Sequence, residues 1–123
     1  KINNRFQDIV ASCMQENKSG NDVLKDSLKI ARDEGIEAML YSHPCNFYGH
    51  GPGPTIGLWN NQDKVLIKGD VLMSYDTTYA LELNTKAKVF GYDYYFYTEE
   101  TVAFTKEGLK YLHPGREHIY FIK

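Results

Sequence analysis

The chain has 123 residues, of which 42% are hydrophobic and 24% are charged, and its net charge is −2. This length fits one domain with one core, and the composition excludes a disordered chain. The small negative charge gives no electrostatic reason to expect binding to nucleic acid or to an acidic membrane. No apolar run approaches the roughly 18 residues that a membrane-spanning helix needs. The chain opens on Lys1 without an apolar leader, so we expect a processed product or a fragment.

Two helices are predicted in the first 35 residues. Apolar residues at helical spacing predict the first helix from about Asn4 to Asn17. Asn21 is the predicted N-cap of the second helix, with Asp22 in the first turn and Gly35 at the far end. Both apolar stripes are interpreted as faces that pack on a core.

Strands are predicted for most of the remaining chain. Short ones are expected at 36–41, 71–74 and 119–122, and long ones at 78–89 and 92–105. The two long strands should pair antiparallel around Gly91. The predicted fold class is therefore α+β, with two N-terminal helices packed on a curved, mostly antiparallel sheet within a single domain, 1–123. An unpaired edge of this sheet would favour a homo-oligomer.

The stretch from Tyr41 to Trp59 concentrates histidine, proline and glycine. Its centre, Gly49-His50-Gly51-Pro52-Gly53-Pro54, cannot be helical. A histidine between two glycines can be approached by a metal ion or a substrate. The same composition also suits a tight turn that simply exposes His50.

Glu82 is a carboxylate between Leu81 and Leu83 in a predicted strand. An unpaired charge is costly if its face of the sheet is buried. The simpler alternative is that Glu82 points to solvent.

Three segments resemble the pita-bread metallopeptidases, and most of all a bacterial Xaa-Pro aminopeptidase or dipeptidase-like branch. The first runs from His43-Pro44 through Gly49-His50 to Gly53-Pro54-Thr55-Ile56-Gly57-Leu58-Trp59. The others are Tyr79-Ala80-Leu81-Glu82-Leu83-Asn84 and Glu99-Glu100-Thr101-Val102-Ala103-Phe104-Thr105. The resemblance covers nearly all of this chain but only the C-terminal half or so of a complete pita-bread domain.

The resemblance implies metal ligands at His50, Glu82 and Glu99. It implies two divalent ions (manganese, cobalt, iron or zinc) in the complete protein, and an incomplete site in this chain alone. His43 is a candidate for substrate contact or proton transfer, with a structural histidine beside a turn as the alternative. The implied substrate is a peptide with proline in the second position, and the implied location is periplasmic or secreted, with the cytoplasm as the alternative.

Two departures from the family pattern define the alternative hypotheses. The family takes two further ligands from aspartates upstream of the first helix, where this chain has no residues. It also usually places a second histidine where Ile56 to Trp59 stand here. The second hypothesis is therefore a non-catalytic pita-bread homologue that binds a peptide or a protein. A third is a self-contained α+β domain of unknown role. Aspartates in the upstream gene sequence would favour the enzyme.

Overall fold

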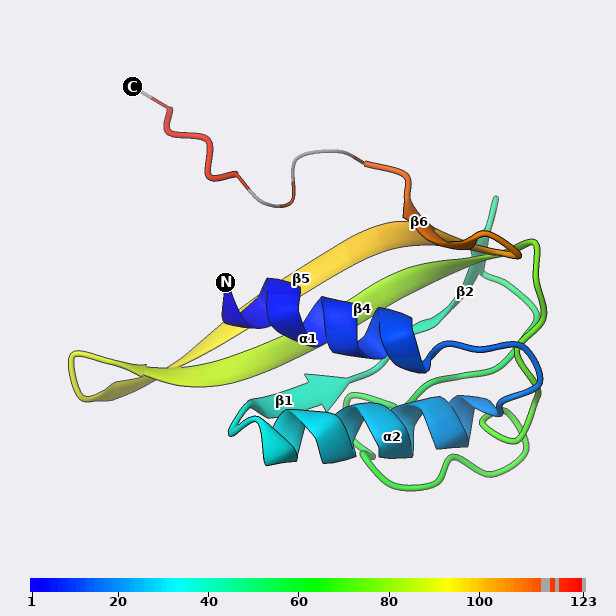
Figure 1. The fold of residues 1–123 in the computed structure, drawn as a ribbon, viewed down its shortest axis with the longest axis horizontal. Helices are drawn as coiled ribbons and strands as arrows, with labels where there is room; N and C mark the ends of the chain where they lie inside the picture. Colours follow the sequence, from blue (N-terminus) through cyan, green and yellow to red (C-terminus); the bar gives the residue numbers. More distant parts are fainter. Residues whose placement is uncertain (114–115, 117, 123) are drawn as a thin grey trace.

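The computed structural model describes residues 1–113, 116 and 118–122, and it confirms the α+β class (Figure 1). Two helices come first, and the strands described in this part of the chain form one antiparallel sheet in the order β3-β2-β4-β5-β6, with β1 also paired to β4. The elements are α1 (Ile2–Cys13), α2 (Gly20–Asp33), β1 (Glu37–Leu40), β2 (His43–Asn46), β3 (Gly49–His50), β4 (Thr77–Val89), β5 (Tyr92–Thr105) and β6 (Gly108–Tyr111). None of the helices in the described residues is long and apolar enough to cross a membrane.

The long β4–β5 hairpin is the central feature of the sheet. Its register runs without interruption from Thr77 opposite Phe104 to Val89 opposite Tyr92. Phe90 and Gly91 form the turn with φ values of 51° and 84°. Two consecutive positive φ values suit the tight two-residue connections that match the twist of paired strands. Both long strands predicted from alternation are confirmed.

The helices begin and end somewhat differently from the prediction. The first ends at Cys13 instead of Asn17. The predicted N-cap Asn21 is wrong: Ser19 caps α2, and its hydroxyl accepts from the Asp22 amide while the Asp22 carboxylate accepts from the Ser19 amide. Asn21 instead bonds the loop before β4, because its side chain accepts from the Val65 amide at 2.9 Å and donates to the Val65 carbonyl at 3.1 Å.

The hydrophobic core lies between the two helices and one face of the sheet. Alternate residues of β4, namely Tyr79, Leu81 and Leu83, are fully buried on this face. They pack with apolar residues of both helices and of neighbouring strands, including Phe6, Ile9, Val10, Val23, Leu24, Leu40, Val102 and Phe104. The helix-facing side of β4 and β5 is termed the covered face, and the opposite side is termed the open face.

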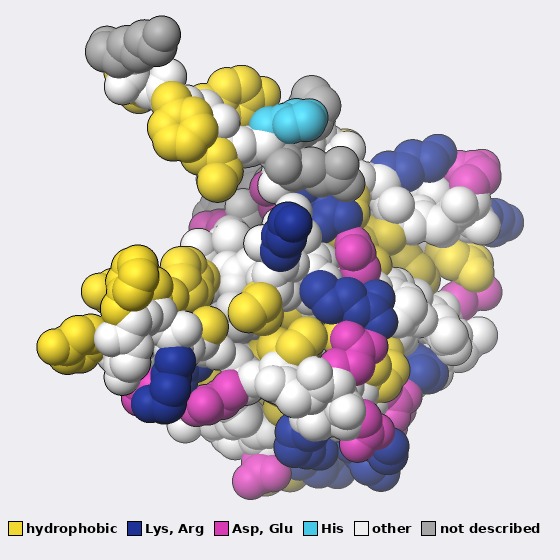
Figure 2. Space-filling model, turned by 60° about the vertical axis from the view of Figure 1, so that its left-hand side comes forward, with side chains coloured by type: hydrophobic (Ala, Val, Ile, Leu, Met, Phe, Trp, Pro, Cys, Tyr) yellow, Lys and Arg dark blue, Asp and Glu magenta, His cyan; other side chains and the backbone are white. Residues whose placement is uncertain are grey.

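Two of the short predicted strands are wrong. Residues 71–74 form only an isolated bridge between Leu72 and Ser19, and residues 119–122 have no regular structure. The side chains from Ile119 to Ile122 are 79–99% exposed, so they do not pack into the hydrophobic core. Figure 2 shows hydrophobic side chains gathered along this segment and at the end formed by the β4–β5 turn.

Candidate functional site

The open face of the hairpin brings two predicted ligands together. Glu82 and Glu99 are direct partners across the β4–β5 pair. Side chains directly opposite each other in an antiparallel pair have Cβ atoms about 4.5–5.5 Å apart. They lie on the open face because Leu81 and Leu83, on either side of Glu82, are buried on the covered one. Two carboxylates thus face the same space.

The β2–β3 hairpin supplies two imidazoles to the same region. His43 in β2 pairs with Ala80 in β4, and His50 in β3 pairs with Cys45 in β2. The two rings have centroids 3.8 Å apart and are tilted by 36°. The His43 Nε2 lies 3.9 Å from the Glu82 Oε2. The structure therefore places His43, His50 and Glu82 side by side although they are far apart in the sequence.

Neighbouring groups set the tautomer of His43 and the pKa of Glu82. The Nδ1 of His43 lies 3.0 Å from the Pro44 carbonyl oxygen, which assigns the hydrogen to Nδ1 in the neutral ring and leaves Nε2 toward Glu82. Burial and the charge of Glu99 raise the pKa of Glu82 above its usual value, while His43 and His50 act in the opposite direction. A bound cation would favour the ionised form of Glu82.

A pocket of about 490 Å³ adjoins these residues. One wall is formed by the sheet and by residues at the ends of its strands. The other wall is formed by the long loop between β3 and β4. The lining residues are Tyr41, Ser42, His43, His50, Thr55, Gly57, Leu58, Trp59, Lys68 and Glu82. Glu99 lies beside this pocket, opposite Glu82, and is not part of its lining.

Ser42 and Gln62 hold the pocket in place, and neither role is predicted from the sequence. The Ser42 hydroxyl donates to the Glu82 carbonyl at 3.2 Å and accepts from the Glu82 amide at 3.0 Å. The Gln62 side chain accepts from the Leu40 amide and donates to the carbonyls of Leu40 and Leu58 at 2.8–2.9 Å. The Gln62 bonds to Leu40 attach the loop to β1 as a further strand would. For the role of Ser42, the only signal in the sequence was its position after an apolar run and next to His43.

Gly57 allows the loop to approach β1 closely. Its φ is +72°, a conformation that favours glycine, and an added Cβ would lie 2.1 Å from the Leu40 carbonyl oxygen. Any larger residue would push the loop away from the sheet. The glycine at this position therefore shapes the pocket.

His50, Glu82 and Glu99 offer the donor types that suit a metal ion, because carboxylate oxygen and imidazole nitrogen bind manganese, cobalt, iron and zinc. Within residues 1–113, 116 and 118–122, however, no three His, Cys, Asp or Glu side chains are arranged to hold a metal ion. The donor chemistry fits, and the arrangement provides part of a ligand set.

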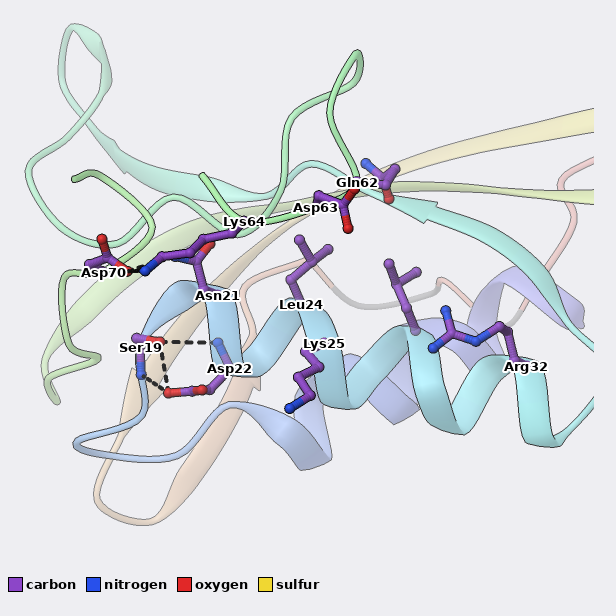
Figure 3. A pocket seen from close by; sticks show the side chains of 11 residues that line it. Ser19, Asn21, Asp22, Leu24, Lys25, Arg32, Gln62, Asp63, Lys64 and Asp70 are labelled. Carbon is purple, nitrogen blue, oxygen red and sulfur yellow. Dashed lines mark hydrogen bonds and ion pairs between the residues drawn. The ribbon is translucent and has the colours of Figure 1, made fainter. Parts of the chain in front are cut away.

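A second cavity, of about 430 Å³, lies between α2 and the loop of residues 62–70 (Figure 3). Asp70 accepts from Lys64 at 3.2 Å and from the Asn21 side chain at 3.0 Å. The capping pair Ser19 and Asp22 is at its end. These polar groups bond one another and fix the loop to the helix, which gives the cavity a structural explanation.

Comparison with known proteins supports the fold. No protein-family model matches the sequence, and no curated protein matches it. Among solved structures, the X-Pro aminopeptidase from Thermotoga maritima MSB8 is similar, with a TM-score of 0.61 and 15% sequence identity. The similarity covers 90% of this chain and 29% of that chain. This chain therefore has the fold of part of an X-Pro aminopeptidase and spans less than a third of that protein's length.

Proposed function

We propose that this chain forms part of a metal-dependent peptidase of the Xaa-Pro aminopeptidase or dipeptidase type. The observation that carries the proposal is the pairing of Glu82 with Glu99 on the open face of the sheet, with His43 beside Glu82 and the His50 ring against His43. The fold shared with an X-Pro aminopeptidase supports it.

In this proposal His50, Glu82 and Glu99 contribute three ligands for divalent ions, and the remaining ligands come from outside this chain. The chemistry that such ions would supply when bound is activation of a water molecule and polarisation of the carbonyl of the bond to be cleaved. The chain's own contribution is to hold the two carboxylates opposite each other on the β4–β5 hairpin and the His50 imidazole on the neighbouring β2–β3 hairpin. His43, whose Nε2 faces Glu82, contacts the substrate or transfers a proton.

A second candidate function is peptide binding without cleavage. Ile56 to Trp59 stand where the resemblance leads us to expect a second histidine, and Leu58 and Trp59 give the pocket an apolar wall instead. In that case the carboxylates on the open face would bind the partner peptide directly.

Metal analysis and a peptidase assay on the complete gene product that contains this chain separate these functions. If the protein is a peptidase, we expect about two metal ions per chain and metal-dependent cleavage of Xaa-Pro peptides. Glu82→Gln should abolish cleavage, while the control Glu100→Gln should not, because Glu100 lies opposite Leu81 on the covered face. Binding of the peptides without metal uptake or cleavage would support the second function and overturn the first.

A further inference from the structure

The two walls of the 490 Å³ pocket differ in charge. The sheet wall carries Glu82, and the loop wall carries Lys68. Among the residues that the structure describes, Lys68 forms no ion pair, whereas Lys64 on the same loop pairs with Asp70 at 3.2 Å. The pocket therefore contains a carboxylate and an ammonium group that do not neutralise each other.

The backbone that carries Lys68 is held in a constrained turn. Ile67 has a φ of +67°, and a β-branched residue in this region is a genuine outlier. The Ile67 amide donates to the Asp70 carboxylate at 3.3 Å, and the Lys68 amide donates to the Leu66 carbonyl at 2.8 Å. Such strained conformations persist where surrounding bonds enforce them, and they cluster at functional sites.

The same turn is attached to the pocket itself. The Thr55 amide donates to the Lys68 carbonyl at 3.0 Å, and Thr55 also lines the pocket. Hydrogen bonds therefore hold the backbone of Lys68 in the loop wall, beside the cavity.

Trp59 supplies an apolar surface to the same wall. Leu58 and Asn61 exchange backbone hydrogen bonds at 2.9 Å in both directions, so Trp59 sits in a tight turn. Its side chain is 73% exposed, although it lines the pocket. An indole ring in this position can cover an aliphatic side chain or a proline ring, because it buries a large area with little loss of side-chain freedom.

We propose that Lys68 binds the C-terminal carboxylate of a short peptide and that Trp59 covers the side chain next to it. The inference rests on the proposed function and narrows its substrate class to peptides of two or three residues with a free carboxylate. The pocket volume lies within the range of about 300–1,000 Å³ typical of small-ligand sites. The sheet wall with His43, His50 and Glu82 then faces the other end of the peptide.

The fluorescence of Trp59 tests this directly, because it is the chain's single tryptophan. This chain is titrated with leucyl-proline and with leucyl-prolinamide, which differ only in the terminal carboxylate. We expect the acid to bind about fivefold more tightly than the amide, the effect of one partly exposed ion pair. Added salt should reduce that preference.

Lys68→Gln should remove the preference for the acid and leave binding of the amide unchanged. Lys106→Gln is the matched control, because Lys106 is an exposed lysine away from this pocket. Equal binding of acid and amide to the unmodified chain, or an unchanged preference in Lys68→Gln, would overturn the role of Lys68. Metal-dependent cleavage by the complete gene product is measured separately, so the proposed function would survive that result. Binding of neither peptide would overturn the inference as well.

Discussion

The covered and open faces of the β4–β5 hairpin differ in packing and in charge. On the covered face, Leu81 and Leu83 are fully buried beneath the helices. On the open face, Glu82 and Glu99 lie directly opposite each other, an arrangement in which like charges destabilise the pair. The covered face stabilises the fold, and the open face keeps two carboxylates in an unfavourable arrangement. The difference locates the candidate site.

The largest expected effect concerns the covered face. Leu83→Ala should lower the free energy of unfolding by about 3 kcal/mol, because it removes buried methyl groups and leaves a cavity. Thr101→Ala, on the open face opposite Ala80, should change it by less than about 0.5 kcal/mol. Urea denaturation measures both. Equal losses would mean that the two faces are not distinct in packing.

The next effect concerns the loop wall of the pocket. Gly57 and Gly35 both have a φ of +72°, but an added Cβ meets the Leu40 carbonyl only at Gly57 and meets nothing within 4 Å at Gly35. Gly35→Ala should cost about 1 kcal/mol through the backbone conformation alone. Gly57→Ala should cost about 2–3 kcal/mol, because the loop or β1 must also shift. Similar losses in thermal or urea unfolding would show that the loop is not tightly attached.

A smaller effect concerns the helix cap on the covered side. Ser19→Ala should cost about 1 kcal/mol at neutral pH. Hydrogen bonds from the Ser19 hydroxyl and amide hold the pKa of Asp22 below its ordinary 3.8. The stability from this lowered pKa is present above pH 3.8 and is lost as the pH falls through the pKa of Asp22 in the folded chain. Denaturation between pH 6 and 2 should therefore show a shallower acid loss for Ser19→Ala than for the unmodified chain, and identical slopes would contradict the capping pair.

The smallest expected effect is a gain. Glu99→Gln should raise the free energy of unfolding of the metal-free chain by about 0.5 kcal/mol, because it removes the repulsion with Glu82. It should also bring the pKa of Glu82 closer to its ordinary value, as followed by NMR titration. Glu100→Gln provides the control on the covered face. A loss of stability in Glu99→Gln would show that the two carboxylates do not repel each other.

Long, regular patterns in the sequence were sufficient to predict much of the fold. The alternation on either side of Gly91 predicted both long strands, and apolar spacing predicted both helices. The apolar runs 71–74 and 119–122 were wrongly predicted as strands. Within the described residues neither run pairs with a strand, and Leu72 makes only an isolated bridge with Ser19. The choice between Ser19 and Asn21 as the cap depended on the loop that Asn21 bonds, a contact 44 residues away along the chain.

The pairing of Glu82 with Glu99 could have been predicted. The two-residue turn at Phe90-Gly91 fixes the register, and each glutamate lies seven positions from the residue that borders the turn. The stacking of His43 on His50 could not, because it depends on a short β2–β3 hairpin inside a stretch rich in proline and glycine. Lys68 and Trp59 enter the pocket through loop contacts that leave no periodic pattern in the sequence.

Manganese titration followed by NMR tests the role of the open face most directly. Paramagnetic Mn²⁺ broadens signals close to its binding site, so even a weak, partial site becomes visible. We predict selective broadening at His50, Glu82 and Glu99, which Glu99→Gln should weaken and Glu100→Gln should leave unchanged. Broadening at other carboxylates, or none at the open face, would contradict the assignment of these residues as metal ligands.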